Sequence, residues 1–220
     1  MPDRPPDVAI SPETRHHVDE MTDALATEFG ERYERAEIEQ LMADSVQQLA
    51  GQANVEDFLP VLAYRFTRER LMSLSRKDAA ATGGLDIVFV SLSGGGRAQI
   101  AAALTTWLSD GGVSVHSAGT GAQQPLEEAI TTVIEEAGID PAESFARPAS
   151  PEVIQAADLI VTMGHSVGRV EIPDGARHVD WRVGDPTGAD LEETRRVRDD
   201  IERRVRALLQ ESGVALRQHP

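Results

Sequence analysis

Residues 85–97 read LDIVFVSLSGGGR, an apolar run followed by a glycine-rich loop and an arginine. Residues 85–90 have the length and branched side chains of a buried strand, and residues 98–108 (AQIAAALTTWL) have the composition of a helix. Loop N–H groups of this kind, together with the N-terminus of the following helix, form an anion site. The guanidinium of Arg97 adds a planar fork that matches a tetrahedral oxyanion. We therefore expect an oxyanion cradle made by Leu92, Ser93, Gly94, Gly95, Gly96 and Arg97.

Charge and composition exclude several classes of protein. The chain of 220 residues has a net charge of −16 and no cysteine. Nucleic-acid partners normally require a basic face, so we expect none. Disulfides, thiolate metal sites and thiol redox chemistry require cysteine, and no metal-ligand spacing occurs, so we expect no metal or other cofactor. The chain lacks both a run of roughly 18 apolar residues and a signal peptide, which predicts a cytoplasmic protein without a membrane partner.

Strand and helix patterns alternate after residue 84. This alternation predicts a parallel four-stranded sheet with helices on both faces. Ligands of such sheets bind beyond the carboxyl ends of the strands, where the 91–97 loop lies. The last helix carries many charges of both signs, which favours a solvated, ion-paired face. The predicted elements are a strand at 85–90, a helix at 97–109, a strand at 113–118, a helix at 125–137, strands at 158–163 and 176–181, and a helix at about 189–212.

A different pattern precedes the sheet. Ser11-Pro12-Glu13 is a helix start, with a capping serine and a proline at the first helical position. Apolar residues at helical spacing predict helices at 12–29, at 35–50 and from about Asn54 onward. Three short helices bury little surface alone, so we expect this bundle to dimerise or to lean on its neighbour. The predicted organisation is a disordered tail at 1–10, a three-helix bundle at 11–76, a linker at 77–84, an α/β domain at 85–212 and a tail at 213–220.

Four parts of the predicted α/β domain resemble one enzyme family. Residues 90–97 (VSLSGGGR) resemble the Cys-x5-Arg loop of the low-molecular-weight protein tyrosine phosphatases and their arsenate reductase relatives. Residues 116–120 (HSAGT) and 157–163 (ADLIVTM) resemble the second and third strands of that family. Residues 181–186 (WRVGDP) and 198–205 (RDDIERRV) resemble its Asp-Pro loop and last helix, closest to the arsenate reductase branch.

The resemblance covers about residues 85–210 and implies a two-step mechanism through a covalent intermediate. By position, Ser91 stands where the family has its nucleophilic cysteine, Arg97 holds the oxyanion and Asp185 is the general acid. Pro186 would fix the loop that presents Asp185. The ligand implied is phosphate, arsenate or a phosphorylated molecule.

Two further side chains are predicted to support the site. Ser117 belongs to the Ser-Ala-Gly of the second strand. His165 follows the third strand, at the rim of the family's site, and is a candidate ligand contact or base. The bundle at 11–76 resembles the dimerisation segment of some bacterial members, which implies a homodimer.

The departures from the family pattern concern catalysis. Besides Ser91, the chain has Gly94 where the family usually has asparagine, and Ala98 where a serine or threonine normally hydrogen-bonds the thiolate. Arsenate reduction by the thiol route is impossible without cysteine, and a serine hydroxyl needs an adjacent general base. Three linked losses favour natural drift of the site over one engineered change. We therefore predict an oxyanion-binding, catalytically inactive or regulatory homologue.

Three alternatives stay open at this point. The chain could be a phosphohydrolase that uses Ser91 with His165 or Asp185 as base, or a Cys-to-Ser variant of an active phosphatase or reductase. It could also be a dimeric scaffold whose loop binds nothing. Independently of these alternatives, Ser91 could be only a small loop residue, Arg97 could form a structural salt bridge and Asp185 could cap a turn.

Overall fold

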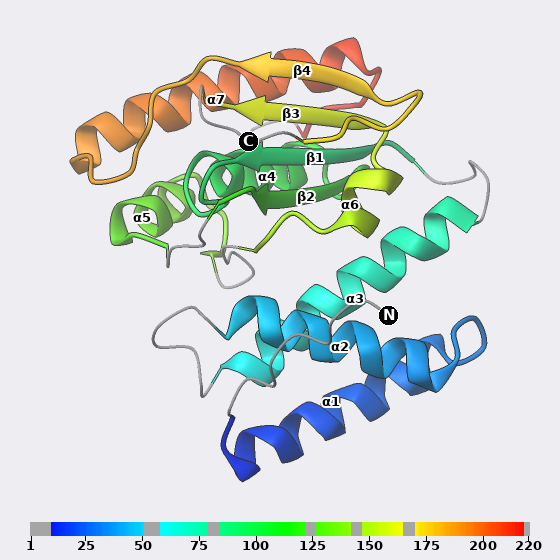
Figure 1. Ribbon diagram of the computed structural model, residues 1–220. Coiled ribbons are helices and arrows are strands. Elements are labelled where there is room, and N and C mark those ends of the chain that lie inside the picture. Colours follow the sequence, from blue (N-terminus) through cyan, green and yellow to red (C-terminus); the bar gives the residue numbers. More distant parts are fainter. Residues whose placement is uncertain are drawn as a thin grey trace. The chain divides into compact units, whose positions relative to one another are not determined.

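The computed structural model divides the chain into two compact units, Met1–Asp78 and Ala79–Pro220. The N-terminal unit is helical, and the second unit contains a parallel four-stranded sheet with helices on both faces (Figure 1). The predicted fold class is therefore confirmed. The structure describes residues 10–50, 58–78, 84–121, 126–141, 147–164 and 170–217.

The N-terminal unit consists of α1 (Pro12–Phe29), α2 (Arg35–Leu49) and α3 (Leu59–Asp78). Ser11 caps α1 as predicted, because its Oγ accepts a hydrogen bond from the Thr14 amide at 3.1 Å. The predicted cap Asn54 lies outside the described residues, and α3 continues two residues into the predicted linker. The three helices enclose an apolar core made of Leu25, Ile38, Met42, Val46, Leu49, Leu59, Ala63, Phe66 and Leu71.

The sheet has the strand order β2-β1-β3-β4, and every neighbouring pair is parallel. Its register aligns Ser91 with Gly119, and Val90 with Thr162. The carboxyl ends of three strands therefore meet at one edge, directly before the glycine-rich loop. The strands are β1 (Asp86–Ser91), β2 (Ser114–Gly119), β3 (Leu159–Met163) and β4 (Arg177–Trp181).

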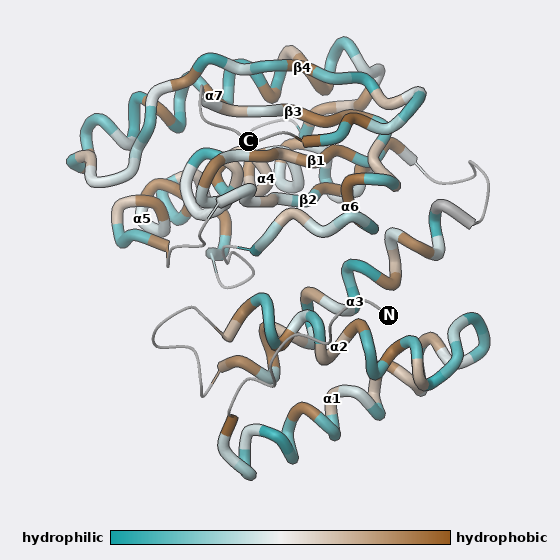
Figure 2. Tube along the Cα trace, in the orientation of Figure 1, coloured by the Kyte–Doolittle hydropathy of each residue, from teal (hydrophilic) through white to brown (hydrophobic). Residues whose placement is uncertain are grey.

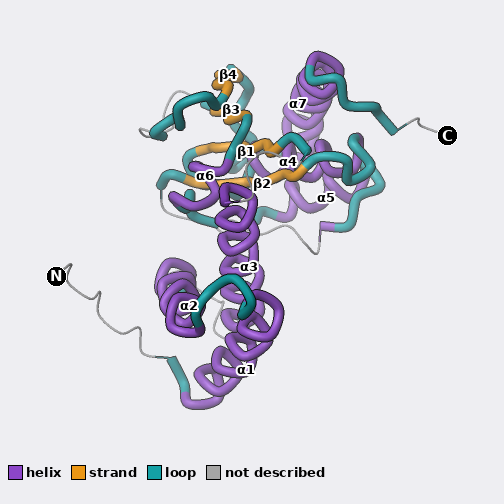
Figure 3. Tube along the Cα trace, turned by 90° about the vertical axis from the view of Figure 1, so that its right-hand side faces the viewer, coloured by secondary structure: helices purple, strands orange, loops and turns teal. Residues whose placement is uncertain are grey.

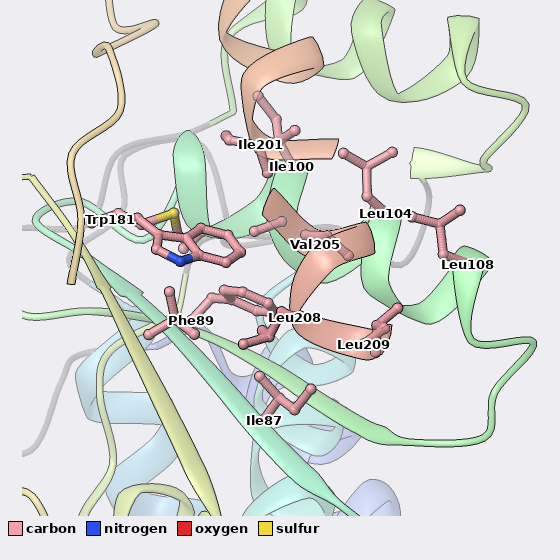
Figure 4. Close-up of a cluster of buried hydrophobic side chains, with 14 of the residues drawn as sticks. Ile87, Phe89, Ile100, Leu104, Leu108, Trp181, Ile201, Val205, Leu208 and Leu209 are labelled. Atoms are coloured by element: carbon pink, nitrogen blue, oxygen red, sulfur yellow. The ribbon is translucent and has the colours of Figure 1, made fainter. Parts of the chain in front are cut away.

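Two apolar clusters hold the helices to the sheet. The larger cluster joins β1 and β3 to α4 (Arg97–Leu108), α5 (Glu128–Glu136) and α7 (Leu191–Glu211) on one side (Figures 3 and 4). The smaller one joins Val88 and Val90 of β1 to α6 (Pro151–Ala156) on the other. Figure 2 shows that β1 is apolar along most of its length, as expected for a strand covered on both faces.

Helix α6 is absent from the predicted elements. Its start repeats the signature of α1: Ser150 Oγ accepts a hydrogen bond from the Val153 amide at 3.3 Å, and Pro151 is the first helical residue. Six helical residues are too few to show a helical period, so only this cap could have revealed the helix.

The predicted ion-paired face of the last helix is confirmed. Arg195 and Arg198 of α7 both contact Glu136 of α5, and Arg196 contacts Glu193 at 2.8 Å. Hydrogen bonding from Arg195 lowers the pKa of Glu136 below its ordinary value. The two contacts with Glu136 are partly exposed to solvent, so they orient α7 against α5 more than they stabilise the unit.

Residues 213–217, predicted as a tail, pack against α4. The Arg217 amide donates a hydrogen bond to the Leu108 carbonyl at 2.7 Å, and its guanidinium contacts Asp110 at 2.7 Å. Val214 and Leu216 are partly buried against the larger cluster. Across the described parts of both units, no helix combines the length and the apolar character that crossing a membrane requires.

Candidate oxyanion site

The glycine-rich loop joins the end of β1 to the first turn of α4 and lies against the end of β2. Gly94 has a φ of 68°, in the left-handed region, and a Cβ at this position would lie 2.7 Å from the Gly119 amide nitrogen. Only glycine therefore permits this backbone path at this separation. Behind the loop, the Gly121 amide donates a hydrogen bond to the Leu92 carbonyl at 2.7 Å, and the Thr120 amide donates to the Ser91 carbonyl at 3.2 Å.

Ser91 is buried beneath the loop, with 2% of its surface exposed. Its Oγ accepts a hydrogen bond from the Gly94 amide at 3.2 Å, and the Oγ of Ser93 accepts one from the Gly95 amide at 3.4 Å. Among the described residues, the contacts of Ser91 Oγ include no carboxylate, imidazole or amine. Two amides of the loop thus donate to serine hydroxyls of the same loop. The bond from the Gly95 amide to Ser93 Oγ is long, so this amide can readily donate to a stronger acceptor instead.

Arg97 begins α4 and extends toward the end of β3. Its Nη2 lies 3.0 Å from Asp185 Oδ2, and the Arg97 side chain is only 11% exposed. The guanidinium lies against Gly164, where an added Cβ would be 2.8 Å from Nη1. Any side chain at Gly164 would therefore displace the guanidinium. Sequence reasoning missed Gly164, although a glycine directly after a buried strand is a signal for close backbone approach.

The Asp185-Pro186 segment lies beside the loop. Asp185 Oδ1 accepts a hydrogen bond from the Thr187 amide at 3.2 Å, which fixes the carboxylate relative to its own backbone. Pro186 is buried, and a Cβ on Gly96 would lie 3.4 Å from its Cγ. Two residues after Pro186, the Gly188 amide donates to both carboxylate oxygens of Glu127, at 3.1 Å to Oε1 and 3.0 Å to Oε2. Glu127, which sequence reasoning missed, thereby connects this segment to the start of α5.

Ser117 lies under the first turn of α4 rather than at the loop surface. Its Oγ accepts a hydrogen bond from Gln99 Nε2 at 2.6 Å, and the two residues are 4% and 3% exposed. This bond ties the start of α4 to β2. Sequence reasoning singled out Ser117 but missed Gln99, a polar residue on the buried face of a helix. His165, the other predicted supporting residue, lies outside the described residues.

These contacts bring Ser91, Arg97, Asp185 and Pro186 to one edge of the sheet. A loop with free or exchangeable amides, a helix N-terminus and a buried guanidinium can together hold a tetrahedral anion. In the parts of the chain that the structure describes, no cluster of histidine, aspartate and glutamate is suited to a metal ion. The described side chains at this edge include a guanidinium, which suits anion binding, and a carboxylate, which suits proton transfer.

Two protein families match this chain. Residues 86–217 match the family described as low molecular weight phosphotyrosine protein phosphatase. Residues 18–75 match the protein-tyrosine-phosphatase-like N-terminal domain. The two matches together cover parts of both compact units.

Known relatives agree with these matches. A candidate arsenate reductase of Halobacterium salinarum is 32% identical over 130 residues, which are 56% of this chain and 89% of that protein. The structure of a thioredoxin-dependent arsenate reductase of Corynebacterium glutamicum is 26% identical, with a TM-score of 0.80 over 90% of this chain and 97% of that one. An arsenate reductase in its phosphate-binding state is 25% identical, with a TM-score of 0.51 over 58% of this chain and 98% of that one. The predicted resemblance is confirmed, and the chain belongs to the low-molecular-weight phosphotyrosine protein phosphatase family.

Proposed function

We propose that this chain is an oxyanion-binding member of its family that has lost turnover and acts as a binding or regulatory protein. Ser91 occupies the nucleophile position, Arg97 is the oxyanion clamp, and residues 92–96 supply the amides. The observation that supports this proposal most strongly is that Arg97 and Asp185 lie together beside a glycine-rich loop, in a chain without cysteine. The proposed ligand is phosphate, arsenate or a phosphorylated molecule, and the proposed location is the cytoplasm.

The contacts of Ser91 favour binding over hydrolysis. A hydroxyl becomes a nucleophile when a neighbouring base removes its proton. Within the described part of the chain, Ser91 Oγ contacts the Gly94 amide, which donates a hydrogen bond to the oxygen and cannot accept its proton. Asp185, a candidate base, contacts Arg97 through Oδ2 and the Thr187 amide through Oδ1. Ser91 is therefore placed to shape the loop.

Calorimetric titration with phosphate and with arsenate tests the proposal. We expect the chain to bind both anions, and Arg97→Ala to weaken binding about 100-fold, because a bidentate charged pair contributes about 3 kcal/mol. Arg177→Ala is the matched control: it removes the same charge at the start of β4, the opposite edge of the sheet, and should bind like the parent chain. Absence of binding to the folded parent chain would reject the proposal and leave the N-terminal unit as the place of function.

Phosphate release from an aryl phosphate distinguishes the alternatives. We expect background rates for the parent chain, for Ser91→Ala and for Ser91→Cys, because Ala98 lacks the hydroxyl that would stabilise a thiolate. Ser91→Cys combined with Ala98→Ser is the matched comparison and should exceed Ser91→Cys by about tenfold, the effect of one unit in thiol pKa. Strong activity of Ser91→Cys alone would support an engineered variant of an active enzyme. Activity of the parent chain that Ser91→Ala abolishes would support a serine-dependent phosphohydrolase.

We further propose that the N-terminal unit holds a homodimer together. Phe58, directly before α3, is 67% exposed, and Val61 and Met72 within the helix are 40% and 44% exposed. Helical spacing places the three apolar side chains on one side. Sedimentation velocity should show a dimer for the parent chain and a monomer for Met72→Glu, since a charge is costly in an apolar interface. Ala24 is an exposed residue of α1, outside this set, so Ala24→Glu adds the same charge and should leave the dimer unchanged. A monomeric parent chain at micromolar concentration would contradict this proposal.

A further inference from the structure

We infer that Asp185 makes the site select tetrahedral anions that carry a proton, such as phosphate and arsenate, over anions that carry none, such as sulfate. The inference rests on the proposed function, because it concerns the anion that Arg97 holds. It assigns Asp185 a role in recognition, which is independent of any role as a general acid. The contact that carries it is the 3.0 Å approach of Asp185 Oδ2 to Arg97 Nη2.

One planar guanidinium has to serve two acceptors. Arg97 has five N–H donors in a fixed plane, and Asp185 Oδ2 lies 3.0 Å from Nη2 on one side of that plane's edge. An anion held by the remaining donors must lie next to the Asp185 carboxylate, since both occupy the edge of the same small group. Two deprotonated oxygens in that position repel each other. If the anion carries a proton, its O–H donates a hydrogen bond to Asp185 instead.

The surrounding contacts keep the carboxylate in this position. Asp185 Oδ1 accepts from the Thr187 amide, the adjacent Pro186 is buried against Gly96, and the Gly188 amide is bound to Glu127. An incoming anion can therefore not move the backbone of Asp185 away without breaking several contacts. The side chain itself is 55% exposed, so solvent screens the repulsion and the selectivity should be moderate.

The charge of the carboxylate, rather than its size, is what distinguishes the anions. Phosphate and arsenate retain a proton near neutral pH, whereas sulfate has none and is otherwise of the same shape. Asp185→Asn keeps the size of the side chain and removes the charge. The resulting amide can accept from an O–H through its oxygen and donate to a bare oxygen through its nitrogen, so it should tolerate both kinds of anion.

The test is calorimetry with phosphate and with sulfate at one pH near neutrality and one ionic strength. We expect the parent chain to bind phosphate about tenfold more tightly than sulfate, a modest preference because the carboxylate is screened. Asp185→Asn should tighten sulfate binding and reduce the preference to about threefold or less. Asp174→Asn is the matched control, because it removes the same charge from the turn before β4, at the opposite edge of the sheet, and should keep the parent preference.

The outcomes separate this inference from the proposed function. Binding of phosphate and sulfate with equal affinity by the parent chain overturns the inference, and so does a preference that Asp185→Asn leaves unchanged. Both results would leave the oxyanion cradle intact. If the folded parent chain binds neither anion, and Asp185→Asn binds neither, the proposed function itself fails and the inference fails with it. Tryptophan fluorescence establishes that each variant is folded.

Discussion

Gly94→Ala is expected to lower the free energy of unfolding of the α/β unit by about 3 kcal/mol and to abolish oxyanion binding. Two effects add at this position. The backbone has a φ of 68°, which alanine adopts only with strain, and the new Cβ would lie 2.7 Å from the Gly119 amide nitrogen. Since the obstacle is backbone in a sheet, the loop has to move, and its amides move with it.

Gly138→Ala separates the two effects. Gly138 has a φ of 76°, but a Cβ there meets no atom within 4 Å, so only the conformational cost of about 1 kcal/mol applies. Urea unfolding followed by tryptophan fluorescence is the suitable measurement, because both tryptophans, Trp107 and Trp181, belong to the α/β unit. Equal losses for the two variants would contradict the close approach of Gly94 to β2.

Phe89→Ala is expected to cost about 3 to 5 kcal/mol of unfolding free energy in the same unit, the usual range for removing a buried phenylalanine. Phe89 is fully buried in the middle of β1, and its ring lies 5.7 Å from that of Trp181 (Figure 4). Removal of the ring would leave a cavity where the larger apolar cluster meets the sheet. We therefore expect oxyanion binding to weaken as well, because β1 ends in the loop.

Phe89→Leu is the matched variant for the core. It keeps most of the apolar volume, so we expect a loss below about 1.5 kcal/mol. Thr106→Ala, at an exposed side chain of α4 in the same unit, should stay within about 0.5 kcal/mol. The measurement is again urea unfolding with fluorescence detection, with far-UV circular dichroism for the helical unit. A loss for Phe89→Ala no larger than that for Phe89→Leu would show that this part of the core collapses around the missing ring.

The order and type of most elements could be predicted from local patterns. The apolar run before the loop predicts β1, and the structure places it one residue later, at Asp86–Ser91. The capping signature at Ser11 predicts the first residue of α1 correctly. Boundaries shifted by one to three residues elsewhere because end residues adopt their conformation through tertiary hydrogen bonds as well as through propensity. Helix α6 was missed because six residues show no period.

The sequence by itself determined the parallel sheet, the glycine-rich loop after its first strand and the resemblance to the phosphatase family. These follow from periodicity, from glycine and proline positions and from short motifs, which are all properties of neighbouring residues. Only the tertiary structure decided that Arg97 meets Asp185, that Gln99 supports Ser117 and that the Arg97 guanidinium lies on Gly164. Those pairs are distant in the chain, and their meeting depends on the strand order and register that align the carboxyl ends of the strands at one edge.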